Sequence, residues 1–331
     1  MPAPRTISLG CSRYDHTDAL LQGAIPVGEF TMRPEPSTDI AELFERVMRG
    51  QEFDVAELGF TFFARSMDLR DPPFYALPVF LLRKFQHSTT FINSASGIRT
   101  PSDLAGKTVG EFALFGHDMG VWPKGIFRDD YGLDPAECKW IVGGVTRPMP
   151  PLDFVPLRRP PGVSVEAVPV DGALGPMLES GEVSALISAQ PPEGISTGSS
   201  LVRRLFPDYR VVEADYHART GIFPIMHLVV AKRELIDHHP GLARALFTAF
   251  DGAKAAAIAR YRAEEPAPEG GPWFTQLLDA DGRLADDGRW NYGVSANRNA
   301  VDTFLRYHFE QGLSDRLLTS DDIYPAELLD T

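Results

Sequence analysis

The sequence predicts an α/β protein built from two lobes, and three observations support this prediction. The chain has 331 residues, more than one hydrophobic core usually spans, so two domains are expected. Residues 6–69 and 107–188 each alternate strand and helix patterns, as chains that form parallel sheets do. One long apolar stretch, residues 219–230, then precedes a mostly helical C-terminal part. We expect this stretch to be a buried strand that returns the chain from the second lobe to the first.

Composition narrows the class of protein. Hydrophobic residues make up 44% and charged residues 23% of the chain, which is typical of globular proteins. The net charge of -13 disfavours nucleic acid and anionic membranes as partners. No signal-peptide pattern or membrane-span run is visible, so we expect a cytoplasmic protein. Cys11 and Cys138 fit free thiols, with one disulfide as the alternative, and a homo-oligomer is left open.

The first lobe begins with strands and helices in alternation. Strands are predicted at residues 6–11, 25–32, 53–58 and 87–93, with short helices at 15–22 and 60–69. The clearest helix begins after Asp39, a residue type that caps helices. Five apolar residues then recur at the spacing of one helical face, namely Ile40, Leu43, Phe44, Val47 and Met48. Pro34 and Pro36 are expected in the loop before it.

The second lobe starts after a glycine-rich break at residues 97–106. Strands are predicted at 107–111, 139–142, 163–168 and 184–188, with helices after the turn 115–120 and at 171–179. Residues 144–162 are rich in proline, so we expect a long surface loop there.

The last part of the chain is expected to complete the first lobe. Pro224 cannot donate a ladder hydrogen bond, so it should lie at the start of the 219–230 strand or on an edge. Helices are predicted at 239–261 and 297–311, separated by a Pro/Gly loop at 266–272, before an irregular tail. The predicted lobes are residues 1–95 plus 218–331, and residues 96–217.

Ligands of open α/β sheets bind beyond the carboxyl ends of the strands, where helix N-termini point. The polar residues that come after predicted strands include Asp15, His16, Thr61 and His117. Six others flank the places where the chain should pass between lobes: Arg83, His87, Ser88, Arg219, Thr220 and His227.

Each candidate histidine also has a purely structural interpretation. His16 could be a solvated loop residue, and His87 a surface residue at a strand start. His117 is explained fully as a helix cap beside Asp118. His227 lies in an apolar run, where a histidine is more often a core residue with hydrogen-bonded nitrogens.

Glu57 lies inside an otherwise apolar strand, so it needs a partner if it is buried. The chain contains no dinucleotide-binding glycine motif, no phosphate-binding loop, no nucleophile elbow and no metal-ligand spacing of Cys and His. No lysine stands out as a Schiff-base former. If the protein is an enzyme, we therefore expect acid–base and electrostatic catalysis without a bound organic cofactor. No metal ligands are predicted, and assistance by a metal is left open.

The chain resembles the 4,5-dihydroxyphthalate decarboxylase family over nearly its full length. The most specific segment is Thr-Gly-Ile-Phe-Pro-Ile-Met-His at residues 220–227. The other matching segments are 14–20, 52–57, 87–93, 97–110, 121–122 with Gly125, 205–209, 292–293 with Asn297, and 305–308 through 311–313. Two places depart from the family pattern: His16 stands where members tend to carry Arg, and residues 115–120 differ from the usual Thr-Ala pair. A related aromatic acid therefore remains as good a substrate candidate as dihydroxyphthalate.

The resemblance implies a type II periplasmic-binding-protein fold with a ligand cleft between the lobes. It also implies loss of CO2 from a hydroxylated aromatic acid after a proton reaches the ring. His16, His87 or His227 would supply that proton, and Glu57 would accept a phenol proton. Arg83 or Arg219, with Thr61, would hold the carboxylates. The remaining predicted substrate contacts are Asp15, His117, Trp122 and Thr220.

Two other readings of the function stay open. The first is a non-catalytic cytoplasmic solute-binding or sensor protein for a small aromatic acid, although the absence of an export signal disfavours a transport receptor. The second is another enzyme of the same fold, resembling chorismate dehydratase or a pyrimidine synthase, whose motifs match the histidine-bearing segments less well.

Alanine substitutions at His16, His87 and His227 test the histidine acid. We expect one of the three to lower kcat by about 10²–10⁴-fold, the usual contribution of a positioned proton donor. The measurement is CO2 release from hydroxylated aromatic acids. Three unchanged kcat values would exclude a histidine as the acid.

Overall fold

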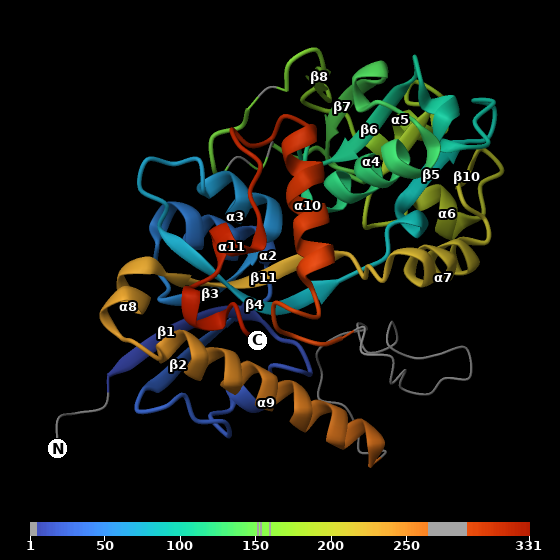
Figure 1. Ribbon diagram of the computed structural model, residues 1–331. Helices are drawn as coiled ribbons and strands as arrows, with labels where there is room; N and C mark the ends of the chain where they lie inside the picture. The colour runs from blue at the N-terminus through green and yellow to red at the C-terminus, as the bar shows by residue number, and fades with distance from the viewer. Residues whose placement is uncertain (1–4, 151, 153, 159, 264–289) are drawn as a thin grey trace. The chain divides into compact units, whose positions relative to one another are not determined.

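The computed structural model describes residues 5–150, 152, 154–158, 160–263 and 290–331. They form two compact units (Figure 1). The first unit comprises Met1–Lys84, Ile225–Asp302 and Leu318–Thr331, and the second Phe85–Pro224 and Thr303–Leu317.

A five-stranded mixed sheet forms the centre of the first unit. Its strand order is β2 (Thr31–Ser37), β1 (Thr6–Ser12), β3 (Val55–Gly59), β11 (Ile225–Lys232) and β4 (Phe74–Arg83). β1 is parallel to β2 and β3, whereas β11 is antiparallel to both β3 and β4. The carboxyl ends of β1, β3 and β4 therefore meet at the edge of the sheet where β11 begins.

Helices cover both faces of this sheet. In Figure 1, α9 (Leu242–Arg262) runs below the strands, while α2 (Ile40–Glu45) and α3 (Phe60–Ser66) lie above them. The Asp39 carboxylate caps α2 by accepting from the backbone N–H groups of Ala41 and Glu42, as its position predicts. The shorter helical elements are α1 (Asp18–Leu21), η1 (Arg46–Gly50), α8 (Arg233–His238), α11 (Ser320–Ile323) and η6 (Ala326–Leu328).

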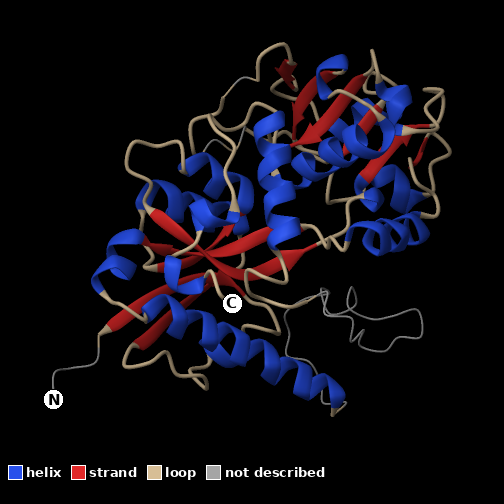
Figure 2. Cartoon of the chain, in the orientation of Figure 1, coloured by secondary structure: helices blue, strands red, loops and turns tan. Residues whose placement is uncertain are grey.

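A six-stranded sheet forms the centre of the second unit (Figure 2). The strand order is β10 (Val202–Arg204), β5 (Thr90–Asn93), β9 (Ala185–Ile187), β6 (Thr108–Phe112), β7 (Lys139–Gly143) and β8 (Ser164–Ala167). The helical elements are η2 (His87–Thr89), η3 (Pro101–Leu104), α4 (Asp118–Tyr131), η4 (Pro135–Glu137), α5 (Leu174–Ser180), α6 (Glu193–Thr197) and α7 (Tyr209–Thr220). Phe91, Leu178 and Leu186 belong to the core that α5 closes over the sheet.

The prediction for the second strand was wrong in position. The strand covers Thr31–Ser37 rather than residues 25–32, and it includes Pro34 and Pro36. β2 pairs only with β1, so it is an edge strand of the sheet. Proline is tolerated there because one side of an edge strand needs no ladder donors.

The stretch 219–230 is a strand only in its second part. Arg219 and Thr220 are the last residues of α7, a helix that was not predicted from the sequence. Gly221, with a φ of 66°, ends that helix in the left-handed conformation that glycine adopts most easily. β11 starts at Ile225, directly after Pro224, so the prediction that Pro224 lies at the strand start is confirmed.

The predicted lobe boundaries differ from the two units. Residues 85–95 group with the second unit because β5 pairs with β9 and β10. Residues 303–317 also group with the second unit, although the prediction placed the whole C-terminal part in the first lobe. The second half of α10 (Arg298–Glu310) packs on α4, where the Trp122 ring lies 5.6 Å from that of Phe304. The predicted loop at 266–272 lies outside the described residues.

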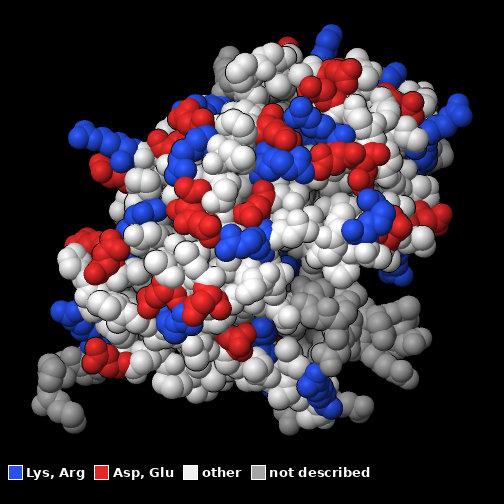
Figure 3. All heavy atoms as spheres, in the orientation of Figure 1, with Lys and Arg blue, Asp and Glu red and all other residues white. Residues whose placement is uncertain are grey.

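The cysteines, the surface charges and the lengths of the helices can each be compared with the sequence. Cys11 and Cys138 are buried free thiols, so the prediction without a disulfide is confirmed. Figure 3 shows acidic and basic side chains interspersed over the face in view. Within the described ranges, no helix combines the length and apolar character needed to cross a membrane.

An ion pair without exposed surface anchors the start of α4. The Lys124 ammonium lies 2.5 Å from the Glu111 carboxylate, and both side chains are 1% exposed. Glu111 also accepts from the backbone N–H of Gly116 at 2.9 Å, and the Lys124 ammonium lies 4.1 Å from the centre of the Phe115 ring. The pair thus ties β6 to the turn before α4 and to α4 itself.

Replacing Lys124 by Met should destabilise the second unit by about 3–5 kcal/mol, because it leaves the Glu111 charge buried without its cation. Urea unfolding of the full chain measures this change. The matched control is Arg128→Met on the same helix, because Arg128 is exposed and its 3.7 Å pair with Glu310 should contribute about 0–1 kcal/mol. Equal effects of the two substitutions would contradict the importance of the buried pair.

Candidate functional site

Two strands of the first unit and the turn after β1 place donors around one buried carboxylate. Glu57, in β3, has no exposed surface. Its Oε1 accepts the Tyr14 hydroxyl at 2.6 Å and lies 2.7 Å from Nδ1 of His227, and its Oε2 accepts the Ser12 backbone N–H at 2.8 Å. Because a carboxylate can only accept, Nδ1 of His227 carries a proton. We call Ser12, Tyr14, Glu57 and His227 the Glu57 cluster.

Sheet register explains why Glu57 and His227 meet. β11 runs antiparallel to β3, with Val229 directly opposite Glu57 and His227 opposite Gly59. Directly opposed residues share a face, and so do residues two apart in a strand, which makes Glu57 and His227 diagonal neighbours on one face. Phe44 of α2 packs edge-on against the His227 ring at 5.1 Å. The His227 side chain retains 10% exposure, whereas Glu57 retains none.

The hydrogen bonds of the cluster determine its charge. Burial by itself would raise the pKa of Glu57, but the bonds from His227, Tyr14 and Ser12 outweigh burial and hold that pKa below its usual value. Burial and the nearby Glu57 charge raise the pKa of Tyr14 well above its usual value. At neutral pH, Glu57 is therefore ionised and Tyr14 is a protonated donor.

His16 lies beside this cluster in the turn after β1. Its ring is 5.1 Å from that of Tyr14 and 5.4 Å from that of Trp290, and the residue is 1% exposed. Its backbone N–H donates to the Asp15 carboxylate at 3.0 Å, and the Tyr261 hydroxyl bonds to the other Asp15 oxygen. Burial lowers the pKa of His16, which favours a neutral ring at neutral pH. The expectation of a solvated loop residue at this position was wrong.

Arg83 and Thr61 also belong to the first unit. Arg83 is the last residue of β4 and pairs in register with Ile225, next to the pairing of Leu82 with His227. Its guanidinium donates to the Asn291 carbonyl at 3.1 Å and to Oδ1 of Asn297 at 2.5 Å. Burial lowers the pKa of Arg83 to about 10, so the guanidinium stays charged at neutral pH. Thr61 is fully buried in the first turn of α3.

His87 belongs to the second unit, whereas His16 and His227 belong to the first. It is 2% exposed, with its ring edge-on to Phe206 at 5.2 Å and to Tyr216 at 5.4 Å. Burial lowers the pKa of His87 to about 4. The ring is therefore neutral at neutral pH, which is a poor state for a proton donor.

Arg219 and Thr220 lie at the carboxyl end of α7, in the second unit. The half-exposed Arg219 guanidinium is 2.8 Å from both Asp130 and Asp215, and these bonds raise its pKa. The Thr220 hydroxyl donates to the Tyr216 carbonyl at 2.7 Å. Both side chains are thus engaged in contacts that stabilise α7.

His117 directly precedes α4 of the second unit, and Trp122 lies in this helix. His117 accepts from the backbone N–H of Met119 at 3.5 Å, so it occupies the cap position of the structural interpretation. Trp122 is fully buried between α4 and α10, against Phe304 and Tyr307. These are the contacts of a helix cap and of a core residue.

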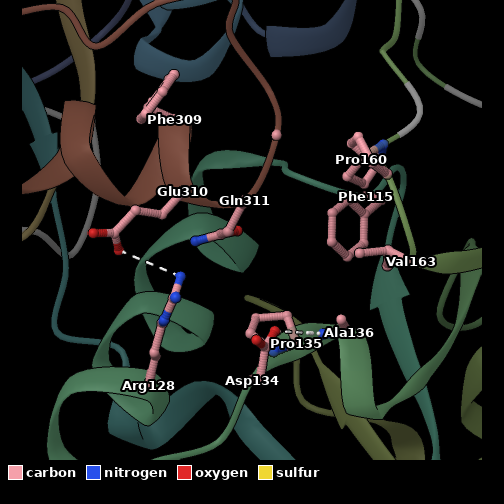
Figure 4. A pocket seen from close by; sticks show the side chains of 12 residues that line it. Phe115, Arg128, Asp134, Pro135, Ala136, Pro160, Val163, Phe309, Glu310 and Gln311 are labelled. Carbon is pink, nitrogen blue, oxygen red and sulfur yellow. Dashed lines mark hydrogen bonds and ion pairs between the residues drawn. The ribbon is translucent and has the colours of Figure 1, made fainter.

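A cavity of about 310 Å³ lies within the second unit, between α4 and the end of α10 (Figure 4). Arg128 and Glu310 face each other across one side of it, and the rings of Phe115 and Pro160 line the other side. None of the residues predicted from the sequence lines this cavity. Among the described residues, no three of His, Cys, Asp and Glu gather as a metal site would require.

Ser12 and Tyr14 are the residues of the Glu57 cluster that were not predicted from the sequence. Only Tyr14 contributes its side chain. It stands two positions after β1 and two before His16, so the rule of strand ends could have included it. The Ser12 backbone N–H and the diagonal placement of His227 depend on sheet register, for which the sequence contains no direct signal.

Comparison with known proteins relates this geometry to a family. No protein-family model matches the chain. A 4,5-dihydroxyphthalate decarboxylase from Comamonas testosteroni is 30% identical over 328 residues, which cover 97% of each chain. This chain belongs to the 4,5-dihydroxyphthalate decarboxylase family. A second member, from Pseudomonas putida, is 30% identical over 216 residues, covering 64% of this chain and 81% of the relative. The named members are carboxy-lyases, as the resemblance predicted.

Solved structures relate the fold of this family member to solute-binding proteins. The putative periplasmic sulfonate-binding protein SsuA of Methylobacillus flagellatus matches with a TM-score of 0.58 and 12% identity, covering 100% of this chain and 94% of that one. The aliphatic sulphonate-binding protein SsuA of Escherichia coli matches with a TM-score of 0.50 and 12% identity, covering 99% and 100%. The predicted periplasmic-binding-protein-like α/β fold is confirmed.

The burial of His87 leads to a pH-dependent stability that can be measured. The unfolded chain binds a proton at this residue below about pH 6.5, whereas the folded chain does so only below about pH 4. Stability should therefore fall as the pH falls from 6.5 to 4, by up to about 3 kcal/mol. Urea unfolding at pH 7 and 4.5 should show a smaller loss in His87→Gln than in the unmodified protein. The exposed His238→Gln serves as control, and a pH-dependent loss as large in His87→Gln as in that control would contradict the assignment.

Proposed function

We propose that this protein removes a carboxylate, as CO2, from a hydroxylated aromatic acid of the 4,5-dihydroxyphthalate type. Membership of a decarboxylase family supports the reaction class. The observation that supports the chemistry most directly is the pair formed by His227 and the buried, ionised Glu57, with the two groups 2.7 Å apart. A histidine oriented by a carboxylate is a general arrangement for proton transfer.

In the proposed reaction, His227 in its protonated form donates to the ring carbon that bears the leaving carboxylate. Glu57 holds the Nδ1 proton, so the proton that is transferred comes from Nε2. Hydroxyl groups on the substrate feed electrons to the ring and raise the basicity of that carbon. The carbon–carboxylate bond then breaks, its electron pair restores the aromatic ring, and CO2 leaves. Solvent returns the proton to Nε2.

We assign Glu57 a positioning role rather than the acceptance of a phenol proton. Both of its oxygens already accept hydrogen bonds, and it has no exposed surface at which a phenol could bind. A fixed negative charge beside His227 stabilises the imidazolium that serves as the acid. The substrate hydroxyls would then be bound by other groups.

Arg83 is our candidate for binding a substrate carboxylate. It is in the same unit as His227, and the two strands that carry them are paired at Ile225 and Arg83. Arginine binds carboxylates through two parallel hydrogen bonds. Arg219 suits this role less well because its guanidinium already forms ion pairs with Asp130 and Asp215.

Incubation of the purified protein with a panel of mono- and dihydroxylated benzoates and phthalates tests the proposal. We expect CO2 release from acids that carry a hydroxyl group conjugated to the leaving carboxylate. His227→Gln should lower kcat by about 10²–10⁴-fold, and His238→Gln should leave it unchanged. His238 is the matched control because it is exposed on α8 and bonds to its own helix at the Glu234 carbonyl.

Other outcomes would contradict parts of the proposal. Binding of the acids without CO2 release would favour the non-catalytic solute-binding alternative. CO2 release at an unchanged rate by His227→Gln would refute His227 as the acid and leave the activity itself standing.

A further inference from the structure

One oxygen of Glu57 receives two donors. The Tyr14 hydroxyl lies 2.6 Å from Oε1, and Nδ1 of His227 lies 2.7 Å from the same atom. Two donors on one oxygen share its negative charge, so a stronger bond to one means a weaker bond to the other. The other oxygen, Oε2, is occupied by the backbone N–H of Ser12.

We propose that Tyr14 is a positioning residue that limits how strongly Glu57 holds the protonated ring of His227. This inference rests on the proposed role of His227 as the acid. Tyr14 does not need to touch the substrate for this role. It would act through Glu57, by withdrawing part of the carboxylate charge from His227.

The local chain conformation delivers the Tyr14 hydroxyl to this position. The chain turns directly after β1: the Thr17 backbone N–H donates to the Tyr14 carbonyl at 3.1 Å, and the Tyr14 backbone N–H donates to Oγ1 of Thr17 at 3.2 Å. The His16 ring lies 5.1 Å from the phenol ring and packs against it. The phenol is therefore held on the carboxylate by the turn and by its ring neighbour.

A proton donor works best when its pKa is near the operating pH. A buried carboxylate with His227 as its main partner would stabilise the imidazolium strongly and make it a weak acid. Sharing Oε1 with Tyr14 reduces that stabilisation. Ionisable groups that interact with Glu57 include Cys11 of β1, Tyr14 and His16 of the following turn, and His227 itself.

Two further residues beside His227 have neutral side chains. Phe44 of α2 packs against His227, and Leu82 of β4 is its register partner. Tyr14 is therefore the neutral hydroxyl donor that shares the negative charge of Glu57 with His227. Removal of the Tyr14 hydroxyl should act mainly on His227.

The test follows the imidazole nitrogens of His227 by NMR during a pH titration of the full chain, with the signals assigned from His227→Gln. Tyr14→Phe should raise the pKa of His227 by about one unit, a tenfold change in its acid dissociation constant. Site-specific replacement of Tyr14 by a difluorotyrosine, whose phenol is more acidic and donates more strongly, should lower that pKa. Because the two variants should shift the His227 pKa in opposite directions, a purely steric effect is excluded.

The matched control is Tyr75→Phe. The Tyr75 hydroxyl also donates to a carboxylate, Asp237, at 3.2 Å, but on an exposed part of β4. It should leave the His227 titration unchanged. If Tyr14→Phe fails to fold, the fluorinated protein retains the test because it keeps every hydrogen bond. A His227 pKa that moves in neither Tyr14 variant would overturn the proposal.

Activity separates this inference from the proposed function. In an active enzyme, the basic limb of the pH profile of kcat should move with the NMR value, upward in Tyr14→Phe. A shifted titration without CO2 release would keep the role of Tyr14 and refute the decarboxylase proposal. CO2 release with an unshifted His227 titration would support the decarboxylase proposal and refute the role of Tyr14.

Discussion

A carboxylate without exposed surface has to be compensated within the protein, and in the first unit this requirement falls on Glu57. An isolated buried charge costs several kcal/mol, whereas three hydrogen bonds keep this one ionised. Those bonds come from three different segments, at Ser12, Tyr14 and His227. The Glu57 carboxylate therefore positions three segments: the end of β1, the turn after it and the start of β11. As a consequence, the His227 ring has a defined orientation.

The three candidate histidines differ in their surroundings. Burial lowers the pKa of both His16 and His87, and neither has a carboxylate contact as short as the 2.7 Å contact between His227 and Glu57. Residue type alone could not separate them, since all three were equally good proton donors in the sequence. Their partners separate them, and only His227 combines a carboxylate partner with a partly exposed ring.

The second unit contains predicted residues whose structural roles are well defined. Trp122 packs α4 on α10, His117 caps α4, and the buried Lys124–Glu111 pair ties that helix to β6. Arg219 bonds to two acids beside it. These residues lie near strand or helix ends, and their contacts there stabilise the helices and strands that carry them.

The sequence by itself determined the α/β class, most of the alternating elements and the cap at Asp39, because apolar periodicity and backbone-restricted residues act locally. It also restricted Pro224 to a strand start or an edge, and β11 begins directly after it. It also indicated that Glu57 needs a partner and that His227 is unusual in an apolar strand. Tertiary structure decided that these two residues are partners, since that depends on β11 pairing antiparallel to β3 in one particular register. It also decided that residues 303–317 belong with α4 and that 209–220 form a helix. Each of these outcomes depends on contacts between residues far apart in the chain, which no local pattern specifies.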